Sequence, residues 1–411
     1  MSVASVVLGR EEKMLVGYAA VAHGIIHVLE LTYAAILPFL LLEFGEGLFV
    51  MGVVATFFSL AFGLGALPAG VLADRIGSKR LMIICLVGGG VGSVGVALSP
   101  NIYILAVSLS LLGLMLGLYH PAGLSLISKA VHQKVVGRGL AVHGIGGSLG
   151  TAVAPVMAAG IAVLYDWRVA YLVPAVLSLG AALAIRRIPA RALSGGNFAG
   201  AAVDNAAPAN PGRILLLPLT VVFIVFTVNG FIYRGMITFL PLHLKDNVHF
   251  TIGGIDEAAM AGAFTTFALL SAILGQWMGG SLGDRIPREV VLLIQAVSQT
   301  VFLSLMGLVA GLPLVAVAAM MAMAYFMAQP LTTGLIADYA PRRLQGRMFG
   351  IAFFMAFGLG SFAAAFAGWV AEASGTSAVF VYLAVVGIAT IISAFFLIWM
   401  ARQRGWSRVV H

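Results

Sequence analysis

Residues 14 to 42 form an apolar run of membrane-spanning length that contains three side chains able to exchange protons, His23, His27 and Glu30. Their spacing of i, i+4 and i+7 places all three on one face of a helix. A carboxylate in the middle of an apolar helix is costly in lipid, so we expect it to face protein or a water-filled cavity. Imidazole, with an ordinary pKa of about 6.5, suits proton relay at physiological pH. This face is therefore predicted to line a transport pathway.

The overall composition predicts an integral membrane protein. The chain has 411 residues, of which 61% are hydrophobic and 9% are charged, and its mean hydropathy is +1.06. Soluble globular domains carry about 25% charged residues. Apolar segments recur along the whole chain, each long enough to cross a hydrocarbon core of about 30 Å as a helix. The short alternating segments of membrane β-barrels do not occur. The predicted class is an all-α membrane protein.

The hydropathy pattern predicts twelve membrane spans, at 14–42, 48–73, 80–98, 102–127, 138–164, 169–187, 214–242, 257–282, 289–310, 312–338, 347–371 and 376–400. Of the 23 Lys and Arg residues, 20 precede the first span or follow an even-numbered span, which leaves Arg168, Arg234 and Lys245. Because cytoplasmic loops are enriched in Lys and Arg, both termini are expected in the cytoplasm. The basic residues thus mark topology, and no nucleic-acid partner is predicted.

Two parts of the chain share a repeated set of motifs. Gly70-Val-Leu-Ala-Asp74-Arg75 recurs as Gly280-Ser-Leu-Gly-Asp284-Arg285, His120-Pro121 as Gln329-Pro330, and Gly137-Arg138 as Gly346-Arg347. The segment between the two sets is rich in Ala, Gly, Pro and Asn, which is typical of a flexible linker. We therefore predict an N-terminal six-helix half (1–187), a cytoplasmic linker (188–213) and a C-terminal six-helix half (214–411). Duplicated six-span units are typical of secondary transporters, whose binding site lies between the halves.

The sequence resembles the major facilitator superfamily over essentially its whole length. The segment Gly70-Val-Leu-Ala-Asp74-Arg75-Ile-Gly77-Ser-Lys79-Arg80 is similar to that superfamily's characteristic loop between spans 2 and 3, and in the second copy Pro287 replaces the second glycine. Within the superfamily, His23 placed fifteen residues before Pro38, Leu118-Tyr119-His120-Pro121-Ala122 and His143-Gly144-Ile-Gly-Gly147 resemble the fosmidomycin-resistance-like branch. The resemblance implies two pseudo-symmetric helical halves that rock around a central site.

The superfamily fold implies that spans 1, 4, 7 and 10 line the central cavity. Each of these spans carries polar side chains in an apolar context, and His143 of span 5 is a further candidate. The predicted substrate and proton pathway consists of His23, His27, Glu30, His120, His143, Asn229, Tyr233, Arg234 and Gln329.

Glu30 and Arg234 are predicted to form an ion pair across the two halves. Arg234 is the one Lys or Arg placed well inside a predicted span, and Glu30 is the one carboxylate at comparable depth. Aligning Leu37-Pro38 with Leu240-Pro241 places the two side chains close together. If Glu30 exchanges a proton while Arg234 holds either Glu30 or an anionic substrate group, this competition would couple two fluxes. A static pair that fixes helix packing is the alternative.

The histidines allow other interpretations. Any of them could be a packing residue whose ring is hydrogen-bonded. His23, His27 and Glu30 also offer nitrogen and oxygen ligands on one face, and His120 could complete a site for a divalent transition metal. Arg234 nearby would repel a cation, which disfavours a metal as the transported substrate.

The loop between spans 2 and 3 is predicted to gate the transport pathway. Asp74 lies at the cytoplasmic end of span 2, next to basic groups and a helix N-terminus that favour a carboxylate. Such contacts can hold one side of a transporter closed and must break on opening. The residues assigned to gating are Gly70, Asp74, Arg75, Gly77, Lys79, Arg80, Arg138, Asp284, Arg285 and Arg347.

Span 5 carries small residues at Gly146-Gly147, Gly150 and Ala154-Pro155, and these resemble the glycine-proline motif of the superfamily's antiporters. Small residues also permit close approach between helices, so packing alone is an alternative explanation.

The leading function implied by these patterns is secondary active transport, namely proton-coupled export, by antiport, of a small organic anion or drug-like compound. Proton-coupled uptake of a small organic anion by symport, divalent metal transport and a non-transporting membrane sensor are the alternatives. No nucleophile and base pair is recognisable, so no enzyme is predicted. Cys85 is the single cysteine and no Walker motif occurs, so no cofactor or resident metal is predicted. The expected partners are a small-molecule substrate, protons and lipid, around a monomer in a bacterial cytoplasmic (inner) membrane.

Overall fold

The computed structural model describes residues 8, 10–132, 135–187 and 215–403. Within these ranges all regular secondary structure is helical. The predicted linker 188–213 lies outside the described residues, so the proposed division into 1–187 and 214–411 stays a prediction at its boundary.

The helices form two bundles. The N-terminal bundle consists of α1 (Arg10–Ala35), α2 (Leu37–Phe44), α3 (Leu48–Ile76), α4 (Ser78–Ala97), α5 (Ile102–Gly117), α6 (Tyr119–Ala130), α7 (Val136–Leu164) and α8 (Trp167–Arg186). The C-terminal bundle consists of α9 (Leu216–Asn247), α10 (Glu257–Arg285), α11 (Arg288–Leu308), α12 (Leu312–Tyr339), α13 (Arg342–Phe353), the π-helical turn η2 (Phe354–Gly358), the short turn η3 (Leu359–Ser361), α14 (Phe362–Ser374) and α15 (Thr376–Gln403).

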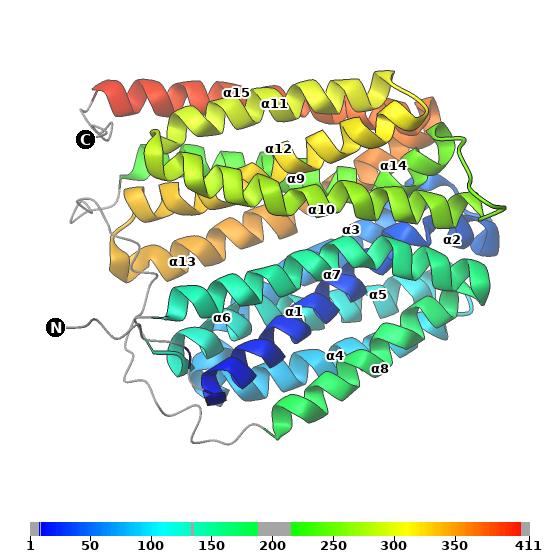
Figure 1. Cartoon of the computed structure of the whole chain (residues 1–411), viewed down its shortest axis with the longest axis horizontal. Coiled ribbons are helices and arrows are strands. Elements are labelled where there is room, and N and C mark those ends of the chain that lie inside the picture. The colour runs from blue at the N-terminus through cyan, green and yellow to red at the C-terminus, as the bar shows by residue number, and fades with distance from the viewer. Residues whose placement is uncertain (1–7, 9, 133–134, 188–214, 404–411) are drawn as a thin grey trace.

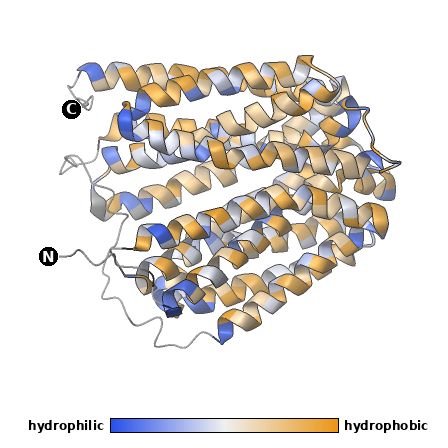
Figure 2. Cartoon of the chain, viewed as in Figure 1, coloured by the Kyte–Doolittle hydropathy of each residue, from blue (hydrophilic) through white to orange (hydrophobic). Residues whose placement is uncertain are grey.

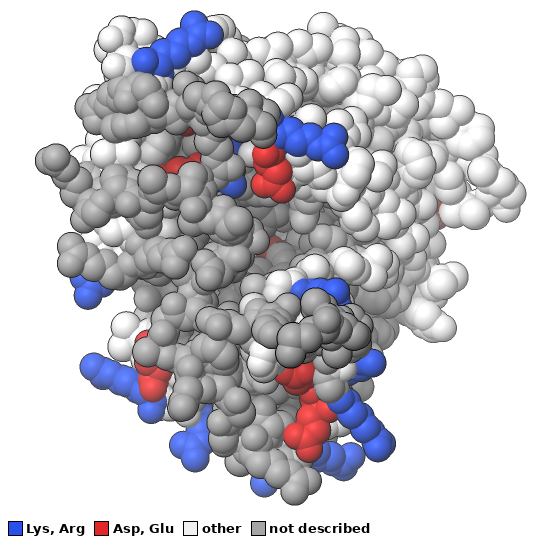
Figure 3. All heavy atoms as spheres, turned by 60° about the vertical axis from the view of Figure 1, so that its left-hand side comes forward, with Lys and Arg blue, Asp and Glu red and all other residues white. Residues whose placement is uncertain are grey.

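The described residues contain twelve helical spans that are long and apolar enough to cross a membrane, the number that the hydropathy pattern predicts. Figure 1 shows the two bundles stacked on one another, with α1 beginning and α15 ending at the same, left-hand end. The helices are hydrophobic along their length, and hydrophilic residues gather at their ends (Figure 2). Lys and Arg side chains of both bundles lie on the left-hand end when it is turned forward (Figure 3). We call this the basic end and the other the opposite end.

Three of the predicted spans are interrupted helices. The first breaks at Ile36, between α1 and α2, and the fourth breaks at Leu118, between α5 and α6. Each break comes shortly before a proline, Pro38 or Pro121, which lacks the backbone N–H and clashes with the preceding turn. The eleventh span is interrupted by η2, and single π-helical turns inside α-helices are frequent at functional sites.

Glycines bring the backbones of α1 and α7 into direct contact. A Cβ added at Gly150 would lie 2.2 Å from the carbonyl oxygen of Gly24, and one added at Gly146 would lie 2.2 Å from that of Ala20. The small residues of span 5 therefore serve close helix packing, as the sequence indicates. This contact positions the polar face of α1 inside the N-terminal bundle.

The two bundles touch closely at the opposite end. A Cβ at Gly52 of α3 would lie 2.3 Å from the Ala364 oxygen of α14, and the Phe49 N–H donates to Glu372 at 2.8 Å. The structure is therefore the conformation closed at the opposite end.

Candidate functional site

The centre of the molecule holds an ion pair between the two bundles. Arg234 Nη1 of α9 lies 2.8 Å from Glu30 Oε1 of α1, and the two side chains are only 3% and 1% exposed. The pair expected from the alignment of Leu37-Pro38 with Leu240-Pro241 is thus present. Two charges withdrawn from water this completely require each other, because either one alone would be strongly unfavourable.

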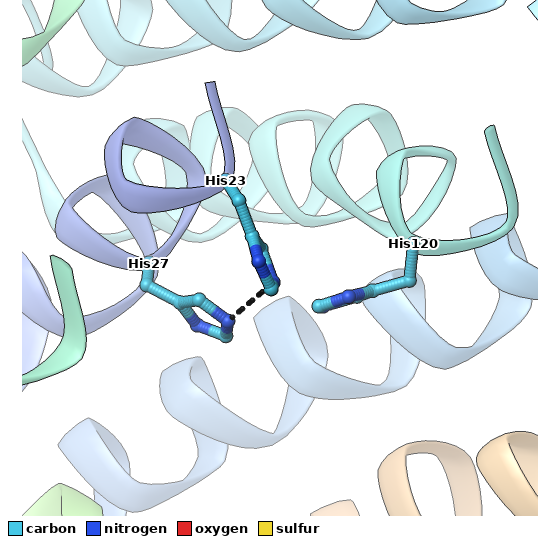
Figure 4. Close-up of side chains that lie close together, drawn as sticks. All are labelled: His23, His27 and His120. Atoms are coloured by element: carbon cyan, nitrogen blue, oxygen red, sulfur yellow. Dashed lines mark hydrogen bonds between the residues drawn. The ribbon is translucent and has the colours of Figure 1, made fainter. Parts of the chain in front are cut away.

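A chain of hydrogen bonds leads from Glu30 into the N-terminal bundle. His27 Nδ1 lies 2.8 Å from Glu30 Oε2, and His27 Nε2 lies 3.2 Å from His23 Nε2. His23 Nδ1 donates to the carbonyl oxygen of His143, at 2.9 Å. Figure 4 shows the two imidazoles of α1 facing one another, with the His120 ring of α6 beside them. The i, i+4, i+7 face predicted from the sequence is therefore a connected set.

Other rings of the N-terminal bundle enclose this chain. The His143 ring of α7 stacks on His23 with centroids 4.1 Å apart, and the His120 ring meets His23 edge-on at 5.1 Å. The Tyr119 hydroxyl donates to the Ala19 carbonyl at 2.5 Å and lies 3.4 Å from His143 Nε2. The other three predicted histidines, His27, His120 and His143, thus all lie against the His23 ring.

Gly147 of α7 leaves the room that the His23 ring occupies. A Cβ at this position would lie 2.4 Å from His23 Cε1, closer than real Cβ contacts allow. By contrast, a Cβ at Gly144, one turn earlier, would meet nothing within 4 Å. The second glycine of the Gly146-Gly147 pair is therefore required for the imidazole as well as for helix packing.

The guanidinium of Arg234 lies among aromatic rings and keeps one edge without a hydrogen-bond partner. Its central carbon lies 5.0 Å from the Phe357 ring centroid of η2, 5.4 Å from Tyr233 and 5.6 Å from Phe62 of α3. Among the described residues, Nε and Nη2 are buried and donate to no acceptor. These two atoms form one side of the guanidinium fork, which is suited to bidentate binding of a carboxylate, sulfonate or phosphonate.

A small cavity lies beside the ion pair, on the side toward the opposite end. Glu30, Tyr33, Ser59, Arg234 and Thr238 are among its lining residues. Its volume of about 20 Å³ is enough for about one water molecule. An organic substrate would need a site of about 300 Å³ or more. This cavity alone therefore holds no organic substrate.

Two predicted pathway residues do not join this cluster. The Asn229 backbone oxygen accepts a hydrogen bond from Tyr325, and its amide oxygen lies 3.5 Å from Gln299 Nε2 of α11, inside the C-terminal bundle. Gln329 is exposed, and its backbone oxygen accepts hydrogen bonds from the Thr332 and Thr333 hydroxyls. Tyr233 does reach the site, since its ring lies against Arg234.

The predicted gating residues all lie at the basic end, where helices begin or end. Gly77 joins α3 to α4 with a φ of +90°, a conformation that favours glycine, and Lys79 Nζ donates to the Arg186 carbonyl at 3.0 Å. The others are placed as follows: Gly70, Asp74 and Arg75 in α3, Arg80 in α4, Arg138 in α7, Asp284 and Arg285 in α10, and Arg347 in α13.

The sequence interpretation missed an ion pair at the basic end of the C-terminal bundle. Arg288 Nη1 of α11 lies 2.6 Å from Asp338 Oδ2 of α12, and Tyr339 donates to Glu289 at 2.5 Å. A usable pattern was present, because Asp338 is a carboxylate near the end of an apolar span and Arg288 directly follows the repeated loop motif. Phe62 and Phe357 were also missed, since aromatic residues in apolar spans carry no mark of facing a site.

His23, His27 and His120, the histidine trio, lie close enough together to be considered as a metal site. Ring nitrogens of His23, His27 and His120 all lie within 4.8 Å of one another. However, the facing nitrogens of His23 and His27 already contact each other, and Glu30 is shared with the Arg234 cation. We therefore describe His23 and His27 as members of a hydrogen-bonded network, with the His120 ring packed beside them, and assign the trio no metal.

Comparisons with known proteins agree with the fold. A sequence model of the Major Facilitator Superfamily matches residues 19–365 and 254–409. The probable sulfoacetate transporter SauU of Cupriavidus necator is 26% identical over 309 residues, which cover 72% of this chain and 70% of the relative. The multidrug resistance protein B homolog of Mycobacterium tuberculosis is 30% identical over 139 residues, covering 34% of this chain and 26% of the relative.

Among solved structures, the bacterial homologue of the human lysosomal transporter Spinster, in its inward-facing and occupied conformation, is similar with a TM-score of 0.71. The sequence identity is 14%, and the match covers 96% of this chain and 97% of that chain. This likeness concerns the fold alone. The narrower resemblance to the fosmidomycin-resistance branch stays a prediction.

Proposed function

Because the chain belongs to the Major Facilitator Superfamily, and is a membrane transporter rather than an enzyme, we propose that it carries a small organic anion together with protons. The proposal has three parts: the class of substrate, the site of proton coupling and the sign of the coupling. Each part depends on the central ion pair.

The observation that carries the proposal is the unpartnered edge of Arg234. Its Nε and Nη2 are buried, and their hydrogens have no acceptor among the described residues. Buried donors without partners are costly, so the site gains free energy when an acceptor arrives. A carboxylate, sulfonate or phosphonate offers two oxygens at the right spacing and a compensating negative charge. The similarity to a probable sulfoacetate transporter supports the same class of substrate.

Glu30 is the proposed coupling group, because it shares Arg234 with the substrate. While Glu30 is ionised it neutralises the guanidinium from 2.8 Å away, which weakens the attraction of a second anion. Protonation removes that competition and leaves Arg234 free to bind the substrate. Proton and anion therefore favour each other's binding, and reciprocal favouring of this kind couples their movement in the same direction.

This coupling favours symport of the anion over the export by antiport that leads among the sequence expectations. Antiport remains the second candidate, supported by the similarity to multidrug resistance protein B homologs over 34% of the chain. A cationic or neutral drug that competed with the proton for Glu30 itself would be exchanged for it. The two candidates thus differ in substrate charge as well as in direction.

The rest of the proposal follows the sequence expectations. The protein acts as a monomer in a bacterial inner membrane, with the basic end in the cytoplasm. Alternating access exchanges the present conformation, closed at the opposite end, for one closed at the basic end. The gating residues of the loops at the basic end form the contacts of that second state, and Asp74 and Asp284 are their proposed carboxylates.

The test is the internal pH of proteoliposomes when sulfoacetate, other organic anions or cationic drugs are added outside. Symport acidifies the interior as the anion enters, whereas antiport makes it alkaline, and this sign does not depend on the orientation of the protein. Glu30→Gln should still bind the substrate but move no protons. Transport of an anion without any change in internal pH, or unchanged coupling in Glu30→Gln, would refute the proposal.

A further inference from the structure

The chain of hydrogen bonds that begins at Glu30 has a hydrogen-bond acceptor at each of its two ends. At one end is the Glu30 carboxylate oxygen, and at the other is the backbone carbonyl oxygen of His143. Two imidazoles, those of His27 and His23, lie between them, so the chain contains three contacts, of 2.8, 3.2 and 2.9 Å. All three fall within the normal range for hydrogen bonds.

With neutral imidazoles and an ionised Glu30, this series of hydrogen bonds contains one hydrogen fewer than it has contacts. Each hydrogen bond needs one hydrogen, and a carboxylate and a carbonyl supply none. Two neutral imidazoles supply one N–H each, so three contacts share only two hydrogens. We infer that Glu30, His27 and His23 together store one proton more than a carboxylate and two neutral imidazoles carry.

The count does not depend on which tautomer is chosen. His23 must donate from Nδ1, because a carbonyl oxygen can only accept, so its Nε2 carries a lone pair when the ring is neutral. If Glu30 is ionised, His27 donates from Nδ1 too, and without a further proton two lone pairs face each other at 3.2 Å. If Glu30 is itself protonated, it donates to His27, which donates to His23. Either arrangement contains the same additional proton.

The groups around the chain determine its charge. Arg234 faces it from α9, His120 and Tyr119 from α6, and His143 from α7. With the stored proton, the carboxylate is balanced and the Arg234 charge is left over, so the cluster carries one net positive charge. A monoanion at the Nε and Nη2 edge would neutralise it. The chain also ends at a carbonyl, which cannot pass a proton on, so it stores a proton and does not conduct one across the membrane.

Given the proposed function, this stored proton is the one that travels with the anion, and His23 is a positioning residue for it. Loss of the proton leaves facing lone pairs on His23 and His27, which must separate. Because both residues lie on α1 and His23 is held by α7, the separation would move His27 and Glu30 relative to Arg234. The proton thus controls the contact between the two bundles.

The experiment counts protons in purified protein reconstituted in lipid, without any transport. Solid-state NMR of protein labelled with ¹⁵N-histidine would be recorded at pH 8, where an exposed histidine with a pKa of about 6.5 is almost entirely neutral. Infrared spectroscopy would report a protonated Glu30 through its acid carbonyl band. We expect one of two results in wild type: one imidazole with both nitrogens protonated, or a protonated Glu30.

His23→Phe keeps a ring between Gly147 and His143 but removes the acceptor for His27, so the additional proton should be lost. His249→Gln, at an exposed position after α9, should retain it. If His23→Phe fails to fold, Gly147→Ala displaces the ring instead. Eight neutral imidazoles with an ionised Glu30, or a bound metal ion found by elemental analysis, would overturn the inference. A stored proton in a protein that moves none would contradict only the proposed function.

Discussion

The two helices that meet at the centre are related by the internal repeat but differ in chemistry. The face of α1 carries three groups that can gain or lose a proton, and they are linked by hydrogen bonds of 2.8 and 3.2 Å. The equivalent face of α9 carries Arg234, whose charge is fixed, and Tyr233, whose ring stacks on Tyr325 at 5.6 Å. One half therefore changes its protonation and the other presents a constant charge. This asymmetry lets protonation of one half alter the attraction between both.

The largest effect should come from removing the fixed charge. Arg234→Leu leaves Glu30 buried at 1% exposure without its counter-ion, and breaking a buried pair costs about 3–5 kcal/mol. Denaturant unfolding in mixed micelles would measure the loss, and transport should be abolished. The double variant Glu30→Leu with Arg234→Leu should regain most of the stability but no transport. If the single variant were as stable as the double one, the two halves would not depend on this pair.

Substitution of Gly147 should show whether transport depends on the position of the His23 ring or only on helix packing. Gly147→Ala places a Cβ 2.4 Å from His23 Cε1, and overpacking of this kind costs about 1–3 kcal/mol. We expect proton-coupled transport to fall about tenfold, corresponding to about 1.4 kcal/mol. Gly144→Ala on the same helix meets nothing within 4 Å and is the matched control. Equal rates for the two variants would show that the position of His23 does not matter.

The sequence predicted most of the α1 face and less of the α9 face. Glu30, His23 and His27 stand out because ionisable groups are rare in apolar spans. The partners that were missed are backbone atoms and rings, namely the His143 carbonyl for His23 and the Phe357 ring for Arg234. These contacts depend on how the helices cross and on the turn η2. Asn229 was grouped with them by its polarity, whereas in this conformation its amide oxygen lies 3.5 Å from Gln299 Nε2. The spacing of residues predicts which of them share a face of a helix, but it does not predict which residues of other helices contact that face.

The loops at the basic end extend the comparison to the gate. Gly77 adopts a φ of +90° between α3 and α4, while Pro287, its counterpart in the repeat, has a φ of −49°. Gly77→Ala should lower the free energy of unfolding by about 1 kcal/mol. This is the low end of the cost of a strained backbone, because the exposed loop can relax. Turnover should fall more than substrate affinity, as measured by uptake kinetics. Gly180→Ala in α8, outside the gating residues and with open space around its Cβ, controls for the added methyl group. A purely structural Gly77 would lower stability and leave turnover unchanged.

The smallest effects should come from two tyrosines, one in span 4 of the N-terminal half and one in span 10 of the C-terminal half. Tyr119 donates to the Ala19 oxygen and lies 3.4 Å from His143, whereas Tyr325 donates to the Asn229 oxygen at 3.1 Å. Each change to Phe removes one neutral hydrogen bond, worth about 0.5–1.5 kcal/mol. Stability should therefore fall equally, but only Tyr119→Phe should shift the pH dependence of uptake, because only Tyr119 touches the titrating half. A similar shift from Tyr325→Phe would mean that the aromatic stack of the C-terminal bundle also responds to the proton, and that the chemical asymmetry between the halves is incomplete.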